Sequence, residues 1–87
     1  MPASRTPSPD AIAFGAVLRR LRLAKHWTYQ DLARASGMHP TYLSILENGG
    51  NEPKVSTLIL LADVFGVDAR SILGEMIALR AVAPAKS

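Results

Sequence analysis

The sequence predicts an all-α fold of five helices in one compact domain. Apolar residues recur at the i, i+3, i+4, i+7 spacing of one helix face, beginning with Phe14, Val17, Leu18 and Leu21. No segment alternates apolar and polar residues between turn signals, as a half-buried strand would. The chain has 87 residues, of which 48% are hydrophobic, and this is enough to build one small core.

The first helix is expected at about residues 11–25, after a disordered arm at residues 1–9. Three of the six prolines of the chain lie in this arm, together with Ser, Thr and Arg. Such a composition is typical of segments that stay disordered. We expect Ser8 to cap the helix, because Pro9 suits a first turn and Asp10 places a negative charge near the positive helix end.

The next two helices are predicted to form a helix-turn-helix at about residues 28–48. Thr28 should open the second helix, with Asp31 as its partner in a variant of the capping box. Gly37 can end that helix in the left-handed conformation. Pro40 marks the first turn of the third helix, which should run to Glu47 or Asn48.

The packing of these two helices needs particular residue types at fixed offsets. Ala33 is small enough for the place where the helices cross, and Gly37 supplies a positive φ four residues later. Met38 can fill the corner between the helices, and Leu43 with Leu46 forms the buried stripe of the third helix. An ordinary helical hairpin is the alternative, but the joint spacing favours a helix-turn-helix.

The last two helices complete a domain predicted to span residues 10–82, with a flexible tail at residues 83–87. The fourth helix is expected at about residues 54–65. Its predicted buried residues are Val55, Leu58, Leu61, Ala62 and Phe65. In the fifth helix, which Asp68 should cap, Ile72 and Leu73 are expected to cover the core.

The end of the fifth helix is more apolar than a closing helix requires, and this predicts a surface that meets a second copy of the chain. The residues predicted for this dimer interface are Met76, Ile77, Leu79 and Val82. The alternative is that these side chains serve only the core of one chain.

Composition and charge exclude several classes of function. The chain has no cysteine, and its two histidines have no carboxylate at ligand spacing, so we predict no metal site and no cofactor. No nucleophile, base and orienting group can be assembled, so we predict no enzyme. No apolar run reaches the roughly 18–20 residues of a membrane span, and the N-terminus does not resemble a secretory signal. A cytoplasmic protein is expected.

The charge distribution points in two directions. The net charge is +3, which weakly favours an anionic partner. Residues 11–27 carry four cationic side chains and no acid, whereas residues 28–53 carry one arginine and three acids. The third helix itself has no Lys or Arg. Three of the basic residues could contact phosphates or could simply form a solvated helix face, namely Arg19, Arg20 and Lys25.

Residues 14–73 resemble the Cro/CI-type (XRE) family of helix-turn-helix proteins. The likeness rests on Leu18, Leu21 and Arg22, on "LA" at 32–33, on Gly37, on "TYLSILENG" at 41–49, on Pro53 and on "LADVFGV" at 61–67. A shorter similarity, in "TYLS", is shared with restriction-modification controller proteins. The resemblance implies a lambda-repressor-like domain, located at the nucleoid, that regulates transcription by binding operator DNA as a homodimer with its third helix in the major groove.

The resemblance also implies roles for single residues. The residues expected to face the bases are Pro40, Thr41, Tyr42, Ser44 and Ile45. Those expected to contact phosphates are Thr28, Tyr29, His39 and Asn48. A salt bridge between Arg22 and Glu47 should lock the third helix onto the first, the alternative being a phosphate contact by Arg22.

Three residues depart from the family pattern. Tyr29 stands where many members have a glutamine that contacts a phosphate and braces the third helix. Pro40 and Ile45 stand where members often have Arg or Gln, and neither can make a bidentate contact to a base. Specificity should therefore rely more on DNA shape and on contacts to thymine methyl groups. A protein-binding module, such as an antitoxin or adaptor, is the rival interpretation.

Overall fold

The computed structural model describes residues 7–82, and this part of the chain forms five α-helices. The helices are α1 Pro9–Ala24, α2 Tyr29–Ser36, α3 Pro40–Glu47, α4 Val55–Phe65 and α5 Ala69–Val82. The described part contains no strand, and the all-α prediction is confirmed. The predictions for residues 1–6 and for the tail at 83–87 fall outside the described residues.

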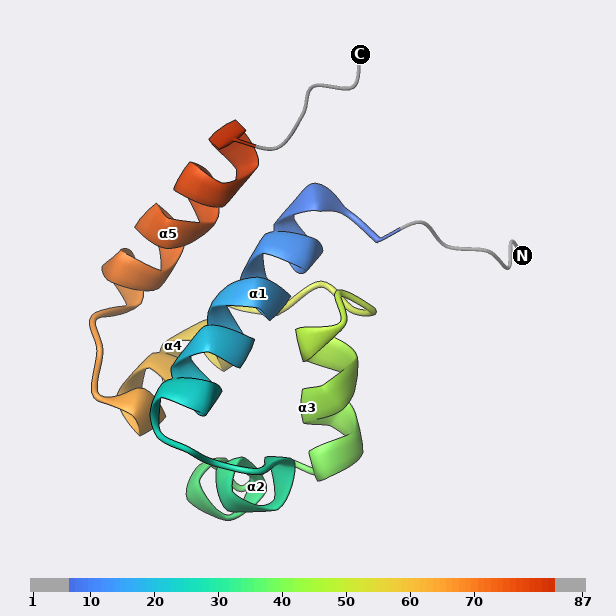
Figure 1. The fold of residues 1–87 in the computed structure, drawn as a ribbon, viewed down its shortest axis with the longest axis vertical. Coiled ribbons are helices and arrows are strands. Elements are labelled where there is room, and N and C mark those ends of the chain that lie inside the picture. The colour runs from blue at the N-terminus through green and yellow to red at the C-terminus, as the bar shows by residue number, and fades with distance from the viewer. Residues whose placement is uncertain (1–6, 83–87) are drawn as a thin grey trace.

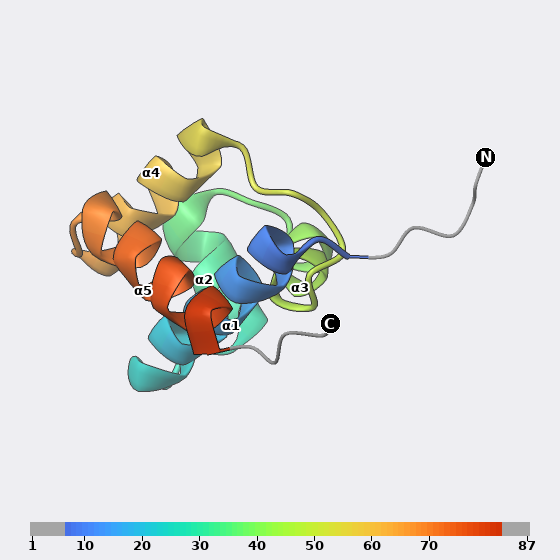
Figure 2. The same ribbon diagram turned by 90° about the horizontal axis from the view of Figure 1, so that it is seen from above.

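The helix α1 lies at the centre of the arrangement (Figure 1). It packs against α5 on one side and against α3 on the other, and α2 lies across the lower end of both α1 and α3. The view from above shows α4 behind this layer, where it contacts α5 and α2 (Figure 2). None of the helices in the described range has the length and apolar character needed to cross a bilayer.

The predicted N-terminal caps of α1 and α2 are present. Ser8 Oγ accepts a hydrogen bond from Ala11 N at 2.9 Å, so α1 starts at Pro9 and not at residue 11 as predicted. In α2 the capping box is complete: Asp31 N donates to Thr28 Oγ1 at 3.1 Å, and Thr28 N donates to Asp31 Oδ2 at 2.9 Å. The bond from Thr28 N is the main reason that the pKa of Asp31 is lowered.

The turn between α2 and α3 has the geometry that the residue spacing predicts. Gly37 ends α2 with a φ of +78°, where a residue with a Cβ would be strained. Ala33 and Met38 are half-buried against the core, and Leu43 and Leu46 are fully buried. These contacts fix the position of α3 against the rest of the domain.

The core contains most of the residues that the periodicity predicts, but two predictions are wrong. Val55 is 75% exposed, because it is the first residue of α4 and precedes the buried part of the helix, which begins at Leu58. Leu73 is 45% exposed, because the buried stripe of α5 runs through Ile72 and Met76, one helical turn apart.

Ion pairs near both ends of the shared interface hold α5 antiparallel to α1 (Figure 1). Arg20 Nε donates to Glu75 Oε2 at 2.5 Å and Arg20 Nη2 donates to Glu75 Oε1 at 2.6 Å. These bonds hold the pKa of Glu75 below its usual range. Toward the other end, Arg80 Nη1 lies 3.0 Å from Asp10 Oδ1.

This docking corrects the predicted dimer interface. Met76 faces the core and is 7% exposed, so it is not available to a second chain. Ile77 and Leu79 are exposed, as an intermolecular surface would require. Val82 belongs to α5, but its side chain is outside the described residues.

Candidate nucleic-acid interface

The helix α3 has one face toward the core and one toward solvent. Leu43, Leu46 and Glu47 are buried. The opposite face contains most of the residues predicted to face bases: Thr41 and Ile45 are exposed, and Pro40 and Ser44 are half-buried. Tyr42 differs from them, because it is half-buried and packs against the core.

The residues at the two ends of α3 are engaged in capping. His39 is exposed, and its Nδ1 accepts a hydrogen bond from Thr41 N at 3.1 Å. A neutral imidazole that accepts at Nδ1 carries its proton at Nε2, which leaves that nitrogen as a donor. At the other end, Asn48 Nδ2 donates to Ser44 O at 2.8 Å. A side-chain amide has two N–H donors, so Asn48 retains a second one.

A buried charged cluster joins α1 to the end of α3. Arg22 Nε donates to Glu47 Oε2 at 2.5 Å and Arg22 Nη2 donates to Glu47 Oε1 at 3.1 Å. Arg22 Nη1 also donates to the Trp27 carbonyl oxygen at 2.8 Å. The Arg22 side chain is 9% exposed and that of Glu47 is 1% exposed. The salt bridge that the family resemblance implies is therefore present, and Arg22 is too enclosed to contact a phosphate.

The electrostatics of this cluster favour the charged form of Arg22. Hydrogen bonding to Glu47 is the main cause that raises the pKa of Arg22 above its ordinary value. Arg19 adds a more distant positive charge, with Nη1 at 3.9 Å from Glu47 Oε1, and its side chain is 61% exposed. Within the described residues, no buried side-chain nitrogen or oxygen lacks a hydrogen-bond partner.

Tyr29 belongs to the same cluster, which revises the role predicted for it. Its hydroxyl donates to Glu47 Oε1 at 2.9 Å, and the Arg22 guanidinium lies 4.2 Å from the centre of its ring. A phenol has one proton to donate. While that proton is on Glu47 it cannot serve a phosphate, so Tyr29 acts as a brace for α3 in this structure.

The Tyr29→Phe variant tests this brace. The ring and its contact with Arg22 stay, but Glu47 loses one hydrogen bond. Hydrogen bonds to charged groups contribute about 1.5–3 kcal/mol, so we expect the free energy of unfolding to fall by an amount in this range. Urea denaturation followed by circular dichroism measures it. Unchanged stability would show that the bond contributes nothing.

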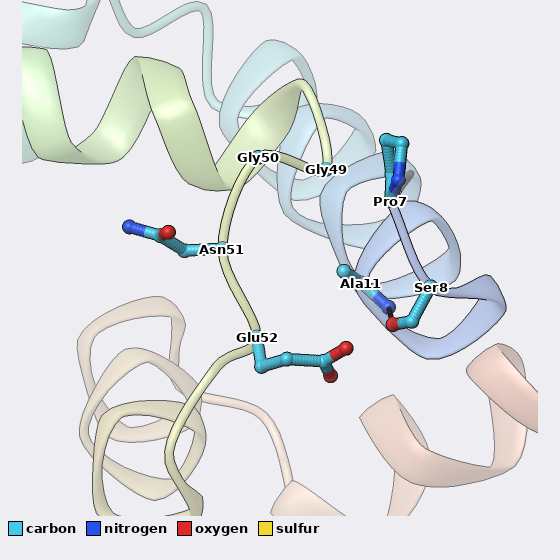
Figure 3. Close-up of a pocket in the computed structure, with 7 residues that line it drawn as sticks. All are labelled: Pro7, Ser8, Ala11, Gly49, Gly50, Asn51 and Glu52. Atoms are coloured by element: carbon cyan, nitrogen blue, oxygen red, sulfur yellow. Dashed lines mark hydrogen bonds between the residues drawn. The ribbon is translucent and has the colours of Figure 1, made fainter. Parts of the chain in front are cut away.

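A shallow hollow lies between the start of α1 and the loop that follows α3 (Figure 3). Its volume is about 100 Å³. The residues that line it are Pro7, Ser8, Ala11, Gly49, Gly50, Asn51 and Glu52. Glu52 is the one ionisable side chain in this lining, so the hollow does not assemble a set of catalytic groups.

Two glycines lie in close contact with α3 or its end, and the sequence does not predict either contact. A Cβ placed on Gly15 of α1 would lie 2.4 Å from the Glu47 carbonyl oxygen. A Cβ placed on Gly50 would lie 2.9 Å from Ile45 Cγ2. The sequence shows only that Gly15 lies within a helical pattern and that Gly50 is the second glycine after the end of a helix. Neither feature identifies the residue that the glycine contacts.

Comparison with known proteins identifies the family. The helix-turn-helix family model HTH_3 matches residues 18–72, which is more than half of the chain. The chain is 37% identical over 59 residues to the ImmF control region 10 kDa protein of Bacillus phage phi105. This match covers 68% of the chain and 66% of the phage protein, so the chain spans just under two thirds of that relative.

Two solved structures share the fold. The clp gene regulator ClgR from C. glutamicum has a TM-score of 0.74 and 35% identity, covering 79% of this chain and 90% of the regulator. The restriction-modification controller protein C.AhdI from Aeromonas hydrophila has a TM-score of 0.70 and 29% identity, covering 75% of this chain and 98% of the controller. The chain belongs to the XRE-type helix-turn-helix family of DNA-binding transcriptional regulators, which are not enzymes.

Proposed function

We propose that the chain binds a two-fold symmetric operator as a homodimer, with α3 in the major groove, and regulates transcription there. The observation that carries this proposal is the outer face of α3, where Thr41 and Ile45 are exposed while a buried cluster holds the opposite face. A helix fixed in this way can present side chains to base edges in a defined register. Such a regulator would act in the cytoplasm, at the nucleoid.

Phosphate contacts would position α3 on the duplex. The candidates are exposed groups on both sides of the helix-turn-helix: the Thr28 hydroxyl, His39 Nε2, the second N–H of the Asn48 amide, and the Arg19 guanidinium. Arg20 is less suitable, because both Glu75 carboxylate oxygens already engage it. Tyr29 is not part of this set, because its hydroxyl already donates its proton to Glu47.

The homodimer would form through the exposed apolar side chains of α5. Ile77 is 66% exposed, and Leu73 and Leu79 are also exposed on this helix. The two ion pairs to α1 keep α5 docked, which leaves these apolar side chains free to meet a second copy. A two-fold dimer of this family would place its half-sites about 34 Å apart.

Selection of bound duplexes from a randomised DNA pool at physiological salt tests the proposal. Enrichment of a symmetric site would support it and would give the half-site spacing. A folded protein that enriches no sequence would contradict it. Sedimentation at the same salt concentration measures the dimer independently, and the Ile77→Asp variant should be monomeric.

The salt dependence of binding gives a further expected result. The dimer should lose affinity as the salt concentration rises, because each phosphate that a Lys or Arg neutralises contributes about −0.9 to the log–log slope. Arg19→Ala removes one cation per protomer, so we expect a slope shallower by about 2 for the dimer. Fluorescence anisotropy with a labelled duplex at several salt concentrations measures both slopes. An identical slope for the variant would exclude Arg19 from the phosphate contacts.

A protein-binding module remains the second candidate, because α3 has no Lys or Arg and residues 28–53 contain three acids. Two of these acids are already engaged: Glu47 is buried with Arg22, and Asp31 pairs with Arg34 at 2.6 Å. Glu52 alone is left to offer a negative charge on this surface. The charge argument for an acidic docking surface is therefore weaker than the sequence implies.

A further inference from the structure

We infer that Ile45, held in place by Gly50, reads thymine in the operator through the C5-methyl group of the base. This inference rests on the proposed function and specifies the class of base pair that α3 prefers. In the major groove, thymine is the base that presents a methyl group, and apolar side chains recognise it.

Ile45 is the one large aliphatic side chain on the solvent face of α3. It is 39% exposed, whereas Leu43 and Leu46 are fully buried. Thr41 lies one turn before it on the same face and is also exposed. No residue of α3 carries the paired donors that read guanine, because the helix contains no Lys, Arg, Asn or Gln.

The backbone at Ile45 is fixed by hydrogen bonds from the residues that follow α3. Its carbonyl oxygen accepts from Gly50 N at 2.9 Å and from Asn48 N at 3.2 Å. The side chain is β-branched, and a β-branched residue in a helix has one strongly preferred χ1 rotamer. Ile45 therefore presents its methyl groups with little conformational freedom.

Gly50 packs against the side chain of Ile45. It is not among the glycines with a positive φ, so its backbone conformation does not require glycine. The available space, however, does require glycine. A Cβ at residue 50 would lie 2.9 Å from Ile45 Cγ2 and 3.3 Å from the Ile45 carbonyl oxygen. The absence of a side chain at Gly50 lets Ile45 Cγ2 pack directly against the loop backbone. Gly50 is thus a positioning residue for Ile45.

The test replaces single thymines of the selected site by uracil, which keeps base pairing and the O4 acceptor but lacks the methyl group. In the wild-type protein, we expect one thymine in each half-site at which this change weakens binding about fourfold, the effect of burying one methyl-sized group. The change in both half-sites together should weaken binding roughly fifteenfold.

Three variants assign the effect. In Ile45→Ala the ratio of affinities for thymine and uracil should fall to about one. In Gly50→Ala the ratio should also fall, while binding to non-specific DNA at low salt stays at the wild-type level. Leu23→Ala is the matched control, because it truncates another exposed aliphatic side chain, on α1, and should keep the wild-type ratio. Circular dichroism confirms that each variant is folded.

The outcomes separate this inference from the proposed function. A selected site at which no thymine is sensitive to uracil would overturn the inference and leave the operator-binding function intact. Sensitivity that persists in Ile45→Ala would also overturn it and would assign the methyl contact to another group, such as Thr41. If no site is selected at all, the proposed function fails and the inference fails with it.

Discussion

Arg22→Ala is expected to lower the free energy of unfolding by about 3–5 kcal/mol. The variant leaves the Glu47 carboxylate, which is 1% exposed, without its bidentate partner. A buried charge that loses its counter-ion costs far more than the intact pair contributes, because no water replaces the lost bonds. Domains of this size have only about 5–15 kcal/mol of stability, so the variant should be close to unfolding at 25 °C.

A paired replacement distinguishes an unpaired charge from the loss of packing. Arg22→Met together with Glu47→Leu removes both charges and keeps apolar volume, so most of the stability should return. Arg70→Ala is the surface control: Arg70 pairs with Asp68, but its side chain is 90% exposed, and no measurable change is expected. Denaturation curves for the variants would refute the interpretation if Arg22→Ala were as stable as the wild type.

The local features of the fold could be predicted because each depends on neighbouring residues alone. The cap at Ser8, the box between Thr28 and Asp31, and the left-handed residue at Gly37 are all present. Each is a contact over three or four residues, and the residue types that make it are few. The family resemblance added the long-range pair of Arg22 with Glu47, which spacing alone does not predict.

The rotation of α5 could not be predicted from its own sequence. The helix has apolar residues at both 72 and 73 and at both 76 and 77, so two stripes fit the same period. Contact with α1 selects the stripe through Ile72 and Met76, and it leaves Leu73 and Ile77 outside. The partner of the Tyr29 hydroxyl was missed for a similar reason, because it depends on how α2 and α3 pack.

Gly15→Ala is expected to destabilise the domain by about 1–3 kcal/mol, although alanine favours helices. The added Cβ would lie 2.4 Å from the Glu47 carbonyl oxygen and 2.6 Å from that of Leu46, so the backbones of α1 and α3 would have to separate. Backbone atoms cannot rotate away as a side chain can. The same shift would displace α3 relative to the rest of the interface, so specific DNA binding should weaken as well.

Gly74→Ala is the matched control for this prediction. Gly74 also lies inside a helix, but a Cβ there would meet no atom within 4 Å. Replacement of a helical glycine by alanine without steric conflict stabilises by about 0.5–1 kcal/mol, so the sign should be opposite to that of Gly15→Ala. Thermal denaturation of both variants measures the difference. If Gly15→Ala were also stabilised, α1 and α3 would not approach each other as closely at this crossing. The rigid placement of α3 that the proposed operator binding needs would then have to come from the Arg22 cluster alone.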